Sequence, residues 1–271
     1  MASIEVLVAT MSQKDLSKYN EMNIQTDAVF ANQDDRYDYL EEVINGNTVK
    51  MITTAQRGLG KNRNIALSHA KADILMLADD DLVYMDGYRE NVLNAFSEIK
   101  DADIIIFNYD TNSERKPRKN KTIKRVRLWN FTKYGTCRIV IKRKAIMKCN
   151  INFALLFGSG SLYNSGEDSL FLRECLKKGL KIYTHPYKTS DVDTRTSTWF
   201  KGFDEEYFFN KGAWLAAAFP ILKYLGALFF TFKIKKRTDF CYKKIIKLLF
   251  LGIKGYEDIV SYKEWKNKSI K

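Results

Sequence analysis

Short apolar runs alternate with amphipathic stretches through the first half of the chain. The apolar runs predict strands near residues 4–9, 27–31, 49–54, 73–78 and 103–108, and the stretches between them predict helices near 12–23, 60–71 and 87–99. This alternation is typical of an α/β fold with a mainly parallel sheet flanked by helices. Residues 74–78 are apolar at every position, as expected for a central strand that is covered on both faces.

Polar residues follow several predicted strands, at the edge where open α/β sheets bind ligands. The most distinctive are three consecutive aspartates, Asp79, Asp80 and Asp81. Adjacent carboxylates repel one another unless a cation compensates them. Because no His or Cys lies near them in the sequence, Asp79 and Asp81 are candidate ligands for Mg²⁺ or Mn²⁺. A helix cap or a solvated turn is the alternative.

A glycine-rich turn at residues 57–61 leads into a predicted helix with Arg63 in its first turn. Cations oppose the helix dipole there, so an anionic ligand would explain them. The turn is not a P-loop, because Ala55 and Asn62 stand where that motif needs Gly and Ser or Thr. Further on, Glu167 and Asp168 open a predicted helix over 169–178, for which simple capping is the alternative role.

In this order and spacing, the motifs resemble family 2 glycosyltransferases with the GT-A (Rossmann-like) fold. The resemblance covers roughly residues 1–200 and rests on the turn into Arg63, the Asp79-x-Asp81 motif, the Glu167-Asp168 pair and the polar segment 193–199. It implies an inverting, hexosyltransferase-like enzyme. Such an enzyme moves a sugar from a nucleotide-sugar donor, here a UDP-sugar, to a hydroxyl of a glycan.

The resemblance also implies roles for individual residues. Asp168 would be the general base, and Glu167 would bind the acceptor. A divalent cation, Mn²⁺ or Mg²⁺, would be held by Asp81, Asp79 and Asp193, with Asp191 as the alternative to Asp193. The residues that would bind the donor are Thr10, Asn32, Gln33, Arg63, Asp79 and Asp80.

The formal net charge of +13 is concentrated in residues 114–127 and 233–254, each with 8 Lys or Arg against one acidic residue. The first segment is interpreted as a surface loop with a strand beginning near Val126, either solvated or facing anionic substrate or membrane phosphates. Nucleic acid is not expected as a partner, because aromatic residues are not interleaved with these charges and no nucleic-acid-binding motif is present.

Residues 213–232 are largely apolar, but Pro220 and Lys223 near their centre disfavour a membrane-spanning helix. The basic and apolar mixture that follows predicts a helical tail that lies on the anionic inner surface of the cell membrane. Internal packing and a partner interface are the alternatives. The tail favours a glycan or polyprenyl-linked acceptor in cell-surface polysaccharide synthesis.

The sequence predicts a catalytic domain at residues 1–204 and a membrane-proximal helical region at 205–271. The N-terminus lacks the pattern of a signal peptide and the four cysteines form no C-x-x-C pair, which favours a cytoplasmic protein peripheral to the membrane. Two rival interpretations stay open: a sugar-phosphate nucleotidyltransferase, although no glycine-rich basic signature follows the first strand, and a non-enzymatic basic membrane- or nucleic-acid-binding module.

Overall fold

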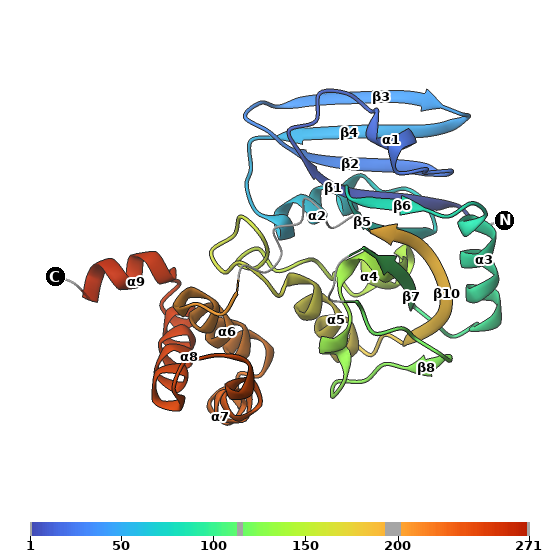
Figure 1. The fold of residues 1–271 in the computed structure, drawn as a ribbon. Helices are drawn as coiled ribbons and strands as arrows, with labels where there is room; N and C mark the ends of the chain where they lie inside the picture. The colour runs from blue at the N-terminus through green and yellow to red at the C-terminus, as the bar shows by residue number, and fades with distance from the viewer. Residues whose placement is uncertain (1, 113–115, 193–201, 270–271) are drawn as a thin grey trace.

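A ten-stranded mixed sheet organises the computed structural model, which describes residues 2–112, 116–192 and 202–269 (Figure 1). The strand order is β3-β4-β2-β1-β5-β9-β7-β10-β6, and β8 pairs with β10. Four neighbouring strands run parallel: β4 (Asn47–Thr54), β2 (Asp27–Gln33), β1 (Ile4–Met11) and β5 (Ile74–Asp79). Strands β7 (Ile104–Thr111) and β10 (Ile182–Val192) form a second parallel pair. The α/β fold is confirmed.

The five strands predicted from apolar runs are all present, as β1, β2, β4, β5 and β7. Five strands were not predicted. One is β10, and the other four pair antiparallel to their neighbours: β3 (Asp38–Ile44), β6 (Leu82–Tyr84), β8 (Lys124–Arg125) and β9 (Ile139–Lys142). Strand β3 lies at the edge of the sheet and has no fully buried residue; only Leu40 and Ile44 are partly buried against the second hydrophobic cluster. A strand of this kind carries little hydrophobic signal.

The helices predicted near 60–71 and 87–99 are confirmed as α2 (Leu59–His69) and α3 (Tyr88–Glu98). The prediction for 12–23 is largely wrong, since only α1 (Lys18–Glu21) forms there. Ser12 and Asn23 have positive φ, and the Asp15 carboxylate accepts a hydrogen bond from the amide of Ser17, which makes a local turn. The prediction of a strand that begins near Val126 is also wrong, because the short strand β8 ends at Arg125. Two 3₁₀ turns follow it, η1 (Phe131–Lys133) and η2 (Thr136–Arg138).

Two hydrophobic clusters cover the opposite faces of the sheet. Along β5, Leu75 and Leu77 belong to one cluster, while Met76 belongs to the other. This alternation follows the two-residue period of a strand. Helix α2 packs in the first cluster and α3 in the second. The central strand is therefore covered on both faces, as its sequence predicts. Two more helices complete this part, α4 (Arg143–Lys148) and α5 (Glu167–Lys177).

The C-terminal helices form a group beside the sheet (Figure 1). They are α6 (Glu205–Ala218), α7 (Lys223–Ile234) with the turn η4 (Lys235–Arg237), α8 (Tyr242–Glu257) and α9 (Tyr262–Ser269). Helices α6 and α8 approach closely, since a Cβ on Gly212 would lie 2.1 Å from the carbonyl oxygen of Leu249, and one on Gly252 would lie 1.8 Å from that of Phe209.

The apolar segment 213–232 is divided between two environments. Its α6 part is mostly buried, whereas α7 leaves large apolar side chains such as Phe229 and Phe232 exposed. Among the residues that the structure describes, no helix combines the length and the apolar character needed to span a bilayer. The first half of the segment is thus explained by internal packing, and the second half is not.

Candidate active site

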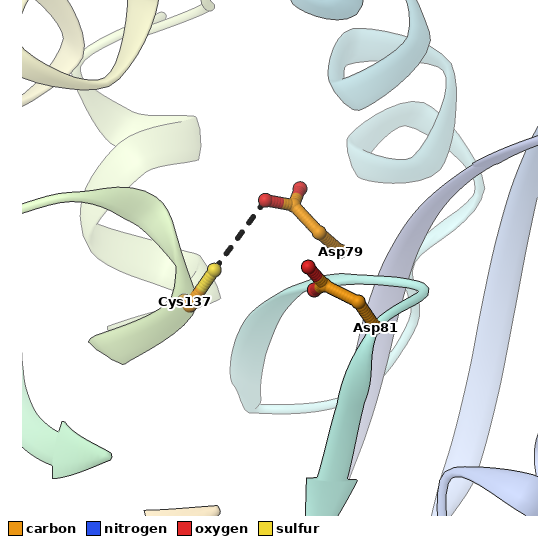
Figure 2. A group of neighbouring side chains, drawn as sticks. All are labelled: Asp79, Asp81 and Cys137. Carbon is orange, nitrogen blue, oxygen red and sulfur yellow. Dashed lines mark hydrogen bonds between the residues drawn. The ribbon is translucent and has the colours of Figure 1, made fainter. Parts of the chain in front are cut away.

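Strand β5 delivers the predicted aspartates to the carboxyl edge of the sheet. It ends at Asp79, and a tight turn through Asp80 and Asp81 leads into β6. Figure 2 shows that Asp79 and Asp81 lie close to Cys137, and each of the three offers a ligand atom within 4.8 Å of the others. The Sγ of Cys137 donates a hydrogen bond of 3.4 Å to Oδ2 of Asp79.

Antiparallel pairing explains why Cys137 reaches this edge. Met76 on β5 pairs with Val140 on β9, so continuing the register places Cys137 opposite Asp79. The thiol is buried, and burial followed by the charge of Asp79 raises the pKa of Cys137 well above its usual value. Two carboxylates fit a hard divalent cation, and a thiol beside them extends the donor set toward softer metals.

The guanidinium of Arg63 joins the aspartate motif to the predicted catalytic pair. From α2, Nη2 donates to Oδ1 of Asp79 and Nη1 donates to Oε1 of Glu167, both at 2.7 Å. The side chain is only 4% exposed, and its guanidinium lies 5.6 Å from the ring centroid of Phe153. A buried arginine between two carboxylates holds them in fixed positions.

Glu167 and Asp168 occupy the first turn of α5, which begins after Gly166 in the left-handed conformation. A Cβ on Gly166 would lie 2.3 Å from the Trp214 ring, so a close approach as well as the positive φ requires glycine. The Ser169 amide donates to Oδ1 of Asp168 at 2.6 Å. Burial, and then the neighbouring charge of Glu167, raises the pKa of Asp168 to about 7.

A cleft of about 740 Å³ contains these groups and extends onto the C-terminal helices. Arg63, Asp79 and Asp168 line one part, while residues of α6 and α9 line the other. Among the latter is Lys211, whose Nζ lies 3.6 Å from the centroid of the Trp214 ring. Burial lowers the pKa of Lys211 to about 8, although the negative charge of Asp168 acts in the opposite direction.

The other predicted donor-binding residues lie at the ends of β1 and β2. Asp80 accepts a hydrogen bond from the hydroxyl of Thr10. Asn32 is fully buried, and its amide bonds to both backbone groups of Gln13 and to the Thr53 hydroxyl. Gln33 accepts from the amide of Gly58 at 2.8 Å. In these positions Asn32 and Gln33 fix the loops after β1 and β4.

The structure thus brings Arg63, Asp79, Glu167 and Asp168 into one cleft, with Asp81 beside Asp79. Asp193 and the segment 193–199 lie outside the described residues. Sequence reasoning missed Cys137 and Lys211. Neither residue has a surrounding motif. Cys137 lies just before the apolar run 139–141, but this position points to Asp79 only when the pairing of that run with β5 is known.

Residues 28–159 match the family model described as Glycosyl transferase family 2. This match identifies residues 28–159 as a family 2 glycosyltransferase domain. The segment of this glycosyltransferase that matches the model contains Arg63, the aspartate motif and Cys137, whereas the Glu167-Asp168 pair lies beyond it.

Solved structures of TarS from S. aureus share the fold of this glycosyltransferase. The complex of TarS 1-349 with UDP-GlcNAc has a TM-score of 0.58 at 14% identity and covers 99% of this chain and 76% of that chain. TarS 1-349 alone has a TM-score of 0.60 at 14% identity and covers 96% of this chain and 93% of that chain. The complex of TarS 1-349 with UDP has a TM-score of 0.59 at 14% identity and covers 98% of this chain and 78% of that chain. Among curated proteins, none matches the sequence of this glycosyltransferase.

Proposed function

We propose that the enzyme transfers a sugar from a UDP-sugar to a hydroxyl of a glycan or lipid-linked glycan, in a metal-dependent reaction that inverts the anomeric centre. One observation carries this proposal: Arg63 links Asp79 to Glu167, with Asp168 beside them in a single cleft. Glycosyl transfer needs positive charge at the diphosphate leaving group and a base at the acceptor hydroxyl, on opposite sides of the anomeric carbon. Arg63 and the cation held by Asp79 would serve the first, and Asp168 the second. The UDP and UDP-GlcNAc complexes of TarS support the choice of donor class.

Asp168 acts as the general base in this mechanism. Its carboxylate takes the proton of the acceptor hydroxyl while that oxygen bonds to the anomeric carbon, and the bond from this carbon to the diphosphate oxygen breaks. The pKa of Asp168, near 7, suits a base that must be ionised and still bind a proton at neutral pH. Glu167, held by Arg63, binds the acceptor.

Asp79 and Asp81 are the residues that would hold a divalent cation, with Asp193 as a further ligand. When bound, Mn²⁺ or Mg²⁺ supplies positive charge that stabilises the departing nucleoside diphosphate. Arg63 binds Oδ1 of Asp79, so Oδ2, which accepts the hydrogen bond from Cys137, is the oxygen that would face a cation. Thr10 and Asp80, which bond to each other, would bind the nucleoside part of the donor.

The tail favours an acceptor at the inner surface of the cell membrane. Helix α7 exposes Leu225, Phe229 and Phe232, and four Lys or Arg follow at residues 233–237. An exposed apolar helix face bordered by cations is typical of proteins that lie on anionic lipid. We therefore place the enzyme in the cytoplasm, peripheral to the membrane, in cell-surface polysaccharide synthesis.

The decisive experiment incubates the enzyme with a panel of nucleotide sugars and with Mn²⁺ or Mg²⁺, and measures nucleotide release with membrane lipid extract as acceptor source. We expect release with a UDP-sugar, loss of release on chelation and recovery when metal is restored. Asp168→Asn should abolish transfer, whereas Asp101→Asn, at a surface ion pair outside the lining of the cleft, should not. Metal-independent turnover, or no turnover with any donor, contradicts the proposal.

A further inference from the structure

A second exposed apolar segment belongs to the sheet-containing part of the enzyme, outside the tail. Residues 121–133 contain five Lys or Arg and no acidic residue. Within this segment Trp129 is 81% exposed and Leu128 is 48% exposed. Neighbouring large apolar side chains that are exposed among cations are typical of a surface that binds a partner or a membrane.

A contact between Phe131 and Phe219 brings this segment beside the start of the tail helices. Their ring centroids are 6.3 Å apart. Phe219 is the first residue after α6, and two exposed residues follow closely: Ile221, which is 94% exposed, and Leu222. Exposed apolar side chains therefore lie close in the chain to both partners of this aromatic contact: Leu128 and Trp129 precede Phe131, and Ile221 and Leu222 follow Phe219. In Figure 1, α7 and β8, the strand just before Trp129, both lie along the lower side of the molecule.

We propose that Leu128 and Trp129 insert into an anionic lipid surface together with Ile221, Leu222 and Leu225, as one docking patch. This inference rests on the proposed membrane-proximal function and deepens it, because the part of the enzyme that carries the sheet then contacts the bilayer directly. The tail alone is not the anchor.

Charge favours a lipid surface over a second copy of the chain as the occupant of the docking patch. Residues 221–237, like 121–133, contain five Lys or Arg and no acidic residue. A second copy would oppose these cations with the same cations, and like charges across an interface repel. An anionic leaflet attracts each of them. A tryptophan beside basic residues is also the side chain that bilayer interfaces accept best.

Attachment to the membrane through both Leu128–Trp129 and the start of α7 would restrict the orientation of the enzyme more than attachment through one helix. A helix lying on a membrane leaves the protein free to rotate about the helix axis. A second insertion point outside that axis removes this rotation, so the cleft keeps a fixed orientation toward the membrane. An acceptor carried by a lipid can then reach Asp168 from one direction only, which lowers the entropic cost of forming the reactive geometry.

The test measures flotation of the full chain with vesicles of phosphatidylcholine alone or mixed with phosphatidylglycerol. The double variant Leu128→Ser/Trp129→Ser should bind the mixed vesicles about tenfold more weakly than the wild type, because two inserted apolar side chains are lost. Val43→Ser is the matched control, since Val43 is 75% exposed on the edge strand β3. Brominated lipids should quench tryptophan emission of the wild type more than that of Trp129→Phe.

The outcomes separate this inference from the proposed function. Unchanged vesicle binding of the double variant, or equal quenching in Trp129→Phe, overturns the docking patch. Wild-type protein that turns over its donor but binds no vesicles overturns membrane docking and leaves the transferase activity standing. A dimer in light scattering that the double variant dissociates also overturns it, because the patch would then join two copies. Donor turnover in the double variant verifies that it is folded.

Discussion

The guanidinium of Arg63 donates a 2.7 Å hydrogen bond to the carboxylate of Glu167, a residue 104 positions further along the chain. Through this bond, α2, the helix after β4, is connected to α5, whose first turn contains the proposed base. The same guanidinium holds Asp79, so a change at any of the three residues reaches the other two.

Replacing Arg63 with Gln should lower the free energy of unfolding by about 3–5 kcal/mol, because two carboxylates would be left without their buried partner. Urea denaturation measures this loss. Arg57→Gln is the control, since Arg57 pairs with Asp35 at the surface and its loss should cost about 0.5 kcal/mol or less. Adding Glu167→Gln to the Arg63 variant should recover part of the stability. Equal losses in the two single arginine variants would contradict the buried pairing.

Asp168→Asn should lower kcat by a factor of about 10² to 10⁴, the range expected for loss of a general base. In the wild type, kcat/KM should fall as the pH drops below about 7, because the raised pKa of Asp168 leaves the base protonated there. Glu167→Gln removes the neighbouring charge that raises this pKa, so its acid limb should move to lower pH. A pH profile with an unmoved acid limb would show that Glu167 does not act on the base.

Lys211→Met should move the acid limb of kcat/KM to higher pH. The cation in the cleft favours the ionised form of Asp168, and its removal raises the pKa of that base. Lys211→Arg should restore the wild-type profile. Lys263→Met, at an exposed lysine of the same cleft, should produce a smaller shift because water screens its charge. Equal profiles for the two methionine variants would remove Lys211 from the electrostatics of the base.

Cobalt binding tests whether Cys137 joins Asp79 and Asp81 around a cation. A thiolate ligand gives Co²⁺ a charge-transfer absorption in the near ultraviolet, which carboxylates alone do not. We expect this band in the wild type, its loss in Cys137→Ser, and retention of weaker cobalt binding by that variant through the carboxylates. Cys149→Ser is the matched control, and a band that survives in Cys137→Ser would place the thiol outside the metal site.

Gly252→Ala should destabilise the pair of helices α6 and α8. The new methyl group would meet the carbonyl oxygen of Phe209 at 1.8 Å, and such overpacking costs about 1–3 kcal/mol or more. Lys254→Ala, on the exposed side of the same helix, should change the unfolding free energy by about 0.5 kcal/mol or less. Thermal unfolding distinguishes the two, and similar melting temperatures would show that the helices can separate at little cost.

Local sequence patterns predicted the five strands with apolar runs and helices α2 and α3. The run 74–78 is apolar at every position, which predicts a central strand, and the structure confirms it as β5. Local patterns failed where polar contacts decide the backbone, as at Ser12 and Asp15, where a turn replaces most of the predicted helix. They also failed at edge strand β3, which has no fully buried residue and no clear alternation of apolar and polar residues.

By itself, the sequence determined the five strands that carry apolar runs and the polar residues that follow them, because apolar runs and strand period are local properties. Only the tertiary structure decided which of those residues meet. Cys137 reaches Asp79 through the register of an antiparallel pair, and Lys211 enters the cleft because α6 packs beside α5. The exposed surface of Trp129 was equally undetermined, since exposure depends on what the rest of the chain leaves uncovered.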